Sequence, residues 1–334
     1  MDWRLGRGAC GLLRQLCGTV ALVLLAGCAA VPDTRVPPSA APGHVARPSP
    51  APTATVTIAA VPTAMSTSSL QDRANTAGPA ATPTSVLSPS PFVGTQAPVL
   101  AGDLISSTAR LDLYRIEGGL TITALVELAP QFEQAIDRVG ARMGAHLNGR
   151  VALSFEPAQR GPCALRGLTL SHQRIIRLYY APETPEQRVL AIVAHELAHE
   201  LQHDYYGWQA HQKSDLILLE GQATWASGDY SLDSHGRPNW QSAAETALAE
   251  GNLLPLDVSL EADCRTATRN SAYTGWASFV AFLLRAGRER FDALYRSGRD
   301  HRPGTADYTG IYGKSLHDLD HDWRLWLVEQ RQAR

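Results

Sequence analysis

The stretch His195-Glu196-Leu197-Ala198-His199 is the most informative part of this chain. Upstream of it, Thr184-Pro185-Glu186-Gln187 predicts a helix start with a capping box and with proline at the first helical position, and Gly207 predicts the end of that helix. Residues four apart on a helix share one face and lie about 6 Å apart along the axis. Two imidazoles on adjacent turns can therefore bind one tetrahedral Zn²⁺. Glu196 lies about 100° around the helix, where it is placed beside a metal-bound water.

The rest of this helix supports a metal site on one of its sides. The apolar side chains form a stripe on a helical wheel, namely Val193, Ala194, Leu197, Ala198, Leu201 and Tyr205. The two histidines fall on the opposite side, so we expect a core face and a separate site face. The alternative is an amphipathic helix with two surface histidines and a glutamate engaged in salt bridges.

A third ligand is required, because catalytic zinc usually has three protein ligands and one open position. Glu220 lies 21 positions after His199, on a predicted helix that can fold back across the first one. The competing third ligands are His211, Asp204 and Asp215. His203 follows His199 by one helical turn and is expected to face a ligand histidine or the substrate instead of the metal.

The two motifs together resemble those of the gluzincins, HExxH peptidases whose third ligand is a glutamate on a following helix. The sequence looks most similar to the peptidase MA-like group, where Glu-Gly-x-Ala marks the third-ligand helix, as Glu220 to Ala223 does here. Tyr273–Val280 and Arg285–Gly287 resemble the second-lobe helix, and Leu316–Leu327 resembles the closing helix. The resemblance covers most of residues 120–330. It implies an α+β fold, in which a sheet of three or more strands packs on the HExxH helix and a mostly helical second lobe follows.

The resemblance also implies a zinc-dependent peptidase with one Zn²⁺ per chain, held by His195, His199 and Glu220. Glu196 is then the general base, and an extended peptide or protein substrate is expected to pair with the edge of the sheet. Many gluzincins carry an acidic residue one turn after the ligand glutamate, which orients a ligand histidine, and this chain has Thr224 there. Two other functions stay open: a surface-displayed binding module that keeps a peptidase fold without catalysis, and a zinc hydrolase of a non-peptide amide.

A tetrahedral intermediate needs a hydrogen-bond donor besides the metal. Gluzincins commonly supply a tyrosine or histidine from the lobe below the cleft. We expect Tyr273 in this role, because it begins the predicted helix after the metal motifs and a neutral hydroxyl can donate. Tyr230 and His235 are alternatives, as is a Tyr273 that serves only as a core residue.

Local patterns predict the other elements. Thr121 begins a helix whose apolar positions recur every 3.6 residues or so. Three strands are predicted at Val151–Phe155, Leu165–Leu170 and Ile175–Tyr180. Later helices are predicted at 213–227, 239–250, 271–286, 288–297 and 314–331.

The amino terminus has the pattern of a bacterial export signal. A segment with three arginines precedes an apolar run from Leu16 to Ala26, shorter than the roughly 20 residues that span a bilayer. The run ends in Leu25-Ala26-Gly27-Cys28, which resembles the lipobox, whose cysteine is lipidated. Residues 1–27 are therefore expected to be a lipoprotein signal peptide, with Cys28 as the anchor on the outer face of a bacterial membrane. An ordinary signal peptide and a small anchor helix are the alternatives.

Residues 28–100 are expected to form a disordered tether. Ala, Pro, Thr and Ser occupy 46 of the 72 positions from 29 to 100, and Phe92 is the one aromatic residue. Such a segment buries too little apolar surface to offset the entropy lost on ordering. The peptidase MA-like domain is therefore expected at 101–334.

Two further features of the sequence bear on compartment and partners. Cys163 and Cys264 lie in the predicted globular part, and in an exported domain they can close one disulfide, the alternative being two buried thiols. The chain has 30 Lys+Arg against 32 Asp+Glu and a net charge of −2. Near neutrality argues against the basic surface that nucleic-acid binding requires, so no nucleic-acid partner is expected.

Overall fold

The computed structural model of the protein describes residues 100–333, which belong to one compact unit. The predicted signal peptide, the anchor Cys28 and the tether up to residue 99 lie outside these residues. Within the described range, no helix has both the length and the hydrophobicity needed to cross a membrane.

The first layer is a mixed five-stranded sheet with the order β1-β2-β3-β5-β4. Its strands are β1 (Asp103–Ser107), β2 (Leu111–Arg115), β3 (Val151–Glu156), β4 (Gly167–Leu170) and β5 (Ile175–Tyr179). The three central strands are parallel, whereas β1 and β4 are antiparallel edges. The three predicted strands are confirmed, and β1 and β2 are additional. The sequence has no local pattern that predicts β1, because its residues are half-buried or exposed at an edge of the sheet.

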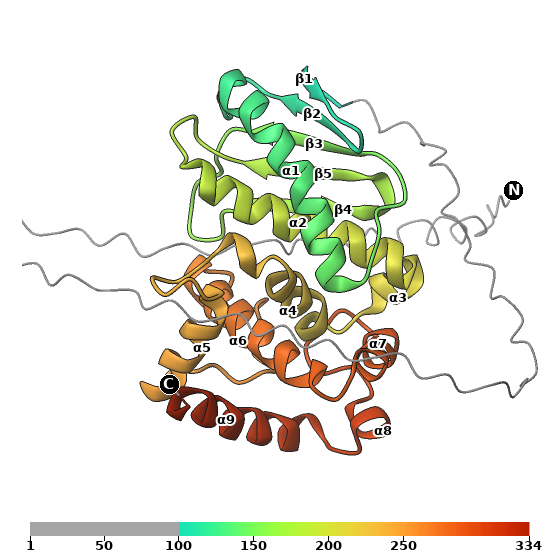
Figure 1. The fold of residues 1–334 in the computed structure, drawn as a ribbon, viewed down its shortest axis with the longest axis vertical. Coiled ribbons are helices and arrows are strands. Elements are labelled where there is room, and N and C mark those ends of the chain that lie inside the picture. The colour runs from blue at the N-terminus through green and yellow to red at the C-terminus, as the bar shows by residue number, and fades with distance from the viewer. Residues whose placement is uncertain (1–99, 334) are drawn as a thin grey trace, which may run out of the picture. The chain divides into compact units, whose positions relative to one another are not determined.

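Two long helices cover one face of this sheet, α1 (Ile122–Met143) and α2 (Glu186–Tyr206), as Figure 1 shows. Thr121 caps α1 as predicted, its hydroxyl accepting a hydrogen bond from the Ala124 amide. The expected capping box at the start of α2 does not form, because Pro185 occupies the cap position and makes no side-chain hydrogen bond. The burial of Val189, Leu197 and Leu201 nevertheless anchors α2 firmly in the core that it shares with α1 and the sheet.

The second layer is helical, as the sequence predicts. It consists of α3 (Trp208–Lys213), α4 (Leu216–Ala226), α5 (Asn239–Ala249), α6 (Thr266–Leu284), α7 (Arg288–Arg296), α8 (Tyr308–Tyr312) and α9 (Leu316–Gln332). The predicted helix at 213–227 is confirmed as α4, which begins at Leu216 because Asp215 caps it and accepts from the Ile217 amide at 2.9 Å, and α3 is additional. The predicted helix at 271–286 begins five residues earlier, at Thr266. A second core, built around Trp276, Phe279 and Trp323, holds this lobe together.

Helix α4 joins the two layers, and Figure 1 shows it below α2 with α6 beside it. Its residues from Leu216 to Ala223 are all buried. Apolar side chains lie on all sides of this helix, because it contacts both layers. Because α4 covers the second face of α2, the expected site face is buried, and His195 and His199 are only 2% and 5% exposed. The metal motif therefore lies inside the molecule.

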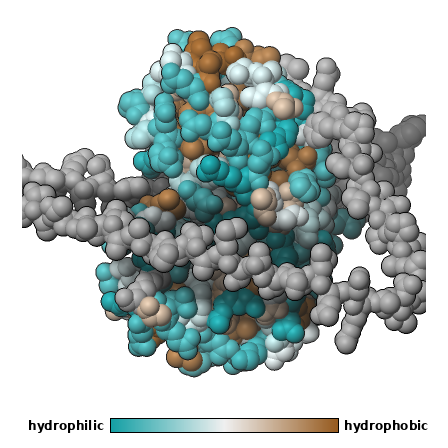
Figure 2. All heavy atoms as spheres, viewed as in Figure 1, coloured by the Kyte–Doolittle hydropathy of each residue, from teal (hydrophilic) through white to brown (hydrophobic). Residues whose placement is uncertain are grey.

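One covalent link also joins the layers. Cys163, in the loop before β4, and Cys264, in the loop before α6, form a disulfide with Cα atoms 5.2 Å apart. This is the pair that the sequence analysis expected. On the face drawn in Figure 2, hydrophobic residues form small separate areas among hydrophilic ones.

Candidate metal centre

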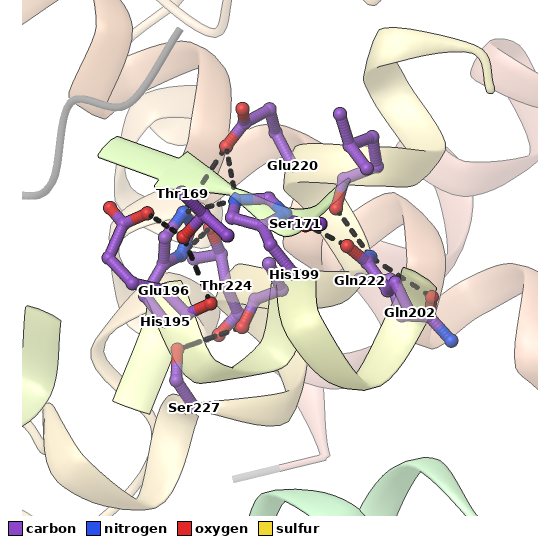
Figure 3. Close-up of polar contacts among 12 residues, drawn as sticks. Thr169, Ser171, His195, Glu196, His199, Gln202, Glu220, Gln222, Thr224 and Ser227 are labelled. Atoms are coloured by element: carbon purple, nitrogen blue, oxygen red, sulfur yellow. Dashed lines mark hydrogen bonds and ion pairs between the residues drawn. The ribbon is translucent and has the colours of Figure 1, made fainter. Parts of the chain in front are cut away.

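Two adjacent turns of α2 and one turn of α4 bring three ligand atoms together. The Nε2 atoms of His195 and His199 lie 3.2 Å apart. The Oε2 atom of Glu220 lies 3.2 Å from the first and 3.6 Å from the second. Figure 3 shows the three side chains converging from the two helices. Among residues 100–333, they are the one group of three or more His, Cys, Asp or Glu side chains placed to hold a metal ion.

The geometry of this group fits a tetrahedral ion. Donors about 2.0–2.1 Å from a tetrahedral centre lie about 3.3–3.4 Å from one another, which is close to the three separations found here. The other carboxylate oxygen of Glu220, Oε1, is buried and has no hydrogen-bond partner within residues 100–333. Two imidazoles and one carboxylate leave a fourth position for water or substrate, so the group could hold a metal ion with one open site.

Glu196 lies beside this group and does not belong to it. Its side chain is completely buried, and its Oε2 accepts a hydrogen bond from the Thr169 hydroxyl at 2.7 Å. Its Oε1 has no hydrogen-bond partner among the described residues. The edge strand β4 passes directly over it, since a Cβ atom on Gly167 would lie 2.2 Å from Oε1. Glycine at position 167 therefore lets the strand approach the carboxylate.

The charges in the group favour a cation. Burial alone would raise the pKa of Glu220, but the His199 charge and the hydrogen bonds from both histidines outweigh it and lower that pKa. Burial raises the pKa of Glu196, and the nearby histidines only partly oppose this shift. One carboxylate thus stays ionised as a ligand, while the other gains affinity for a proton.

Two side chains orient the ligand histidines, and neither was anticipated in this role. The Nδ1 of His199 lies 2.8 Å from the Gln202 Oε1, and the Gln202 Nε2 donates to the Leu219 carbonyl at 2.8 Å. Because a carbonyl only accepts, the amide nitrogen must face it, and Oε1 must then accept from an Nδ1–H of His199. This tautomer leaves the Nε2 lone pair of His199 directed at the metal position.

The second orienting side chain is Thr224, about one helical turn after Glu220 on α4. Its hydroxyl lies 3.4 Å from the Nδ1 of His195 and is placed to accept from an Nδ1–H. Gln202 lies 22 positions before Thr224 in the chain. It follows His199 by three residues on the same helix, so its side chain can reach the His199 ring. That helical spacing was the one available signal for Gln202.

Tyr273 lies against the metal group, although not at the start of its helix as expected. It is the eighth residue of α6, because this helix begins at Thr266. Its ring stacks on that of His195 with centroids 5.9 Å apart and an interplanar angle of 11°. Tyr273 is 3% exposed and packs against the ligand histidine from the second lobe.

The other candidates lie elsewhere. His203 contacts Asp204 and the rings of Trp208 and His211, and the ligand histidines are contacted by Gln202 and Thr224 instead. Its expected contact with a ligand histidine is therefore not found.

The rival ligands have other partners. Asp204 binds Arg174 at 2.8 Å, and Asp215 caps α4. His211 lies 3.2 Å from the Tyr295 hydroxyl, and burial lowers its pKa well below the usual value. Of the alternative donors, Tyr230 packs in the first core, and His235 is exposed in a turn.

The sequence also did not predict a buried ion cluster between α2 and the connection from β4 to β5. Glu200, next to His199 in the chain, is completely buried and binds Arg174 at 3.0 Å. Arg174 also holds Asp204 and lies at the tight connection between β4 and β5, where its φ is 58°. The sequence shows only single charges at these positions, and their pairing depends on the packing of α2 against the sheet.

Comparison with known proteins adds no family to these observations. A scan against protein-family models gives no match to this chain, and a search among curated proteins gives none either.

Proposed function

We propose that the protein is a zinc-dependent peptidase of the gluzincin type. The observation that carries this proposal is the convergence of His195, His199 and Glu220, with the Glu196 carboxylate beside them. A carboxylate that is adjacent to a three-ligand site and outside it is what metal-assisted hydrolysis requires.

The ligand set supports zinc among the metals. Two imidazoles and one carboxylate suit zinc, whereas Ca²⁺ and Mg²⁺ prefer oxygen ligands only. A zinc ion held here would polarise a peptide carbonyl and bring a water molecule close to ionisation at neutral pH. The ligands would be His195, His199 and Glu220 through the three atoms that face one another.

The chain itself supplies the proton transfers. Glu196 accepts a proton from the attacking water and passes it to the leaving amine. Its raised pKa suits this cycle, because a carboxylate of higher pKa is a stronger base toward the attacking water, and a pKa closer to the working pH suits a group that both accepts and releases a proton. The hydrogen bond from Thr169 fixes one oxygen, so the unbonded Oε1 is the atom for proton transfer.

Strand β4 is suited to align an extended peptide. It is an edge of the sheet, and two of its residues, Gly167 and Thr169, touch Glu196. A peptide that pairs with this edge would pass over the general base. We assign Tyr273, stacked on His195, as the candidate oxyanion donor from the second lobe.

The burial of the site favours a second candidate function. His195, Glu196, His199 and Glu220 are each at most 5% exposed, and enclosed zinc sites are commonly structural. The alternative is therefore a binding module that retains the metal for stability and has no catalytic activity.

One experiment separates the two candidates. The full-length protein is tested for bound zinc by elemental analysis and for cleavage of a mixed peptide library, alongside Glu196→Gln and His199→Ala. We expect about one zinc per chain and cleavage that Glu196→Gln reduces about 10²–10⁴-fold while zinc is retained. His199→Ala should lose the zinc. Zinc without cleavage would support the binding module, and cleavage that survives Glu196→Gln would contradict the peptidase mechanism.

We further propose that the protein is exported and anchored on the outer face of a bacterial membrane by lipid on Cys28, with the domain on its tether facing peptide or protein substrates. The support is the sequence pattern around Cys28. Cys28→Ser should abolish fatty-acid labelling and shift the protein to the soluble exported fraction or leave it unprocessed. Labelling that persists in this variant would place the anchor elsewhere.

A further inference from the structure

Arg269, near the start of α6, is a buried cation without a counter-ion among the residues that the structure describes. It is only 3% exposed, and its Nη2 donates to the Ala164 carbonyl at 3.3 Å. Its Nε is buried with no hydrogen-bond partner. None of the ion pairs formed among residues 100–333 includes it. An unpaired buried charge destabilises a fold, so a contribution to stability does not explain why this guanidinium is buried here.

Its position relates it to the metal centre. Arg269 precedes Tyr273 by four residues and therefore lies on the same face of α6, one turn away. That face is the one that reaches the metal centre, because the Tyr273 ring stacks on His195. Arg269 thus lies one helical turn from the residue that stacks on the ligand His195.

The loop that Arg269 contacts leads straight into the strand over Glu196. Ala164 precedes Gly167 by three residues, and Gly167 lies against the Glu196 carboxylate. The Cys163–Cys264 disulfide and a 3.2 Å bond from the Thr266 amide to the Pro162 carbonyl fasten this loop to α6. The loop before β4 is therefore held against α6 next to Arg269.

We propose that Arg269 forms a carboxylate-binding subsite of the active site, where the loop before β4 meets α6. The inference rests on the proposed peptidase function. A guanidinium binds a carboxylate through two parallel N–H donors, and the unbonded Nε–H supplies one of them. The ligand is a carboxylate of the peptide, either its C-terminal group or the side chain of an acidic residue.

The geometry also limits the length of peptide on this side. Ala164 and Gly167 are three positions apart along the loop that leads into β4, so they are separated by at most about 10 Å. An extended substrate covers that distance with about three residues before it meets the loop. The recognised carboxylate therefore lies about two or three residues from the bond that is cleaved.

The test measures binding apart from cleavage. Full-length protein carrying Glu196→Gln is titrated by calorimetry with N-acetyl-Ala-Ala-Ala as the free acid and as the carboxamide. A second pair of peptides, blocked at both ends, carries Glu or Gln at the third position. The same titrations are made with Arg269→Gln, Arg269→Lys and the control Arg265→Gln, which removes an exposed arginine of the same segment.

We expect the protein to bind one charged peptide at least about tenfold more tightly than its neutral partner, as for a hydrogen bond to a charged group. The pair that shows the preference identifies a terminal or a side-chain carboxylate. Arg269→Gln should abolish the preference, Arg269→Lys should keep part of it, and Arg265→Gln should leave it unchanged. A thermal unfolding scan of each variant verifies that it is folded.

Two results would overturn the subsite: equal affinities within both peptide pairs, or a preference that Arg269→Gln leaves intact. Cleavage of a peptide library without any preference for carboxylates at this distance would also count against the subsite and leave the peptidase proposal standing. If the protein prefers carboxylates but cleaves no peptide, the peptidase proposal fails and the subsite stands.

Discussion

Gln202 shows how a single buried amide can determine the state of a metal ligand. It accepts from His199 while donating to the Leu219 carbonyl and to Gln222, whose own amide donates to Tyr206. The donor and acceptor roles in this chain fix which nitrogen of His199 carries the proton. The histidine is thereby presented to the metal with its free Nε2.

Replacing Gln202 separates its two roles. Gln202→Leu should weaken zinc binding about 10–100-fold, the usual effect of removing an orienting partner. Gln202→Glu keeps an acceptor for His199 but cannot donate to the Leu219 carbonyl, so it should retain zinc affinity while lowering stability. Competition with a chelator and a thermal unfolding scan measure the two quantities. Equal zinc affinity in the wild type and in Gln202→Leu would rule out the orienting role.

At the scale of elements, the contact between β4 and α2 determines the placement of the general base. In Gly167→Ala, the new Cβ would meet the Glu196 carboxylate, with 2.2 Å to Oε1. The side chain of Glu196 must then swing away, whereas the backbone of residue 167 has no positive φ to forbid alanine. We expect peptide cleavage to fall about 10²-fold or more with a small loss of stability.

The matched control for this substitution is Gly275→Ala in α6. Its added Cβ would have no neighbour nearer than 3.8 Å, so activity should be unchanged and stability equal or higher. Cleavage rates and unfolding midpoints of the two variants are compared side by side. Full activity in Gly167→Ala would show that the carboxylate is not held where the structure places it.

At the scale of the whole molecule, the disulfide links the two layers across a long loop. Cys163 and Cys264 are 101 positions apart, and closing a loop of that size stabilises by roughly 4–5 kcal/mol in the chain-entropy model. The double variant Cys163→Ser/Cys264→Ser should lose stability of this order in denaturant unfolding. Reductant should destabilise the wild type and leave the double variant unaffected. Two free thiols in the native protein would contradict the link.

Metal removal should also act on the whole molecule. The ligands come from α2 in the first layer and α4 in the second, so an ion bound there ties the two together. Binding to the folded state alone stabilises by about 2.7 kcal/mol at a free concentration of 100 Kd. A chelator should therefore lower Tm, and added zinc should restore it. In His199→Ala, Tm should respond to neither, and a full response there would place the metal elsewhere.

The sequence by itself determined the metal motifs and most helices, because these depend on local spacing along one helix or on local apolar periodicity. His195 and His199 were identified in this way, whereas Glu220 was identified through the resemblance of Glu220 to Ala223 to a known motif. Only the tertiary structure decided that the site is buried, because α4 packs on the face of α2 that the helical wheel leaves open. It also decided which side chains surround the metal group. Gln202 and Arg269 owe their surroundings to carbonyl groups on other segments of the chain, and no local pattern records such contacts.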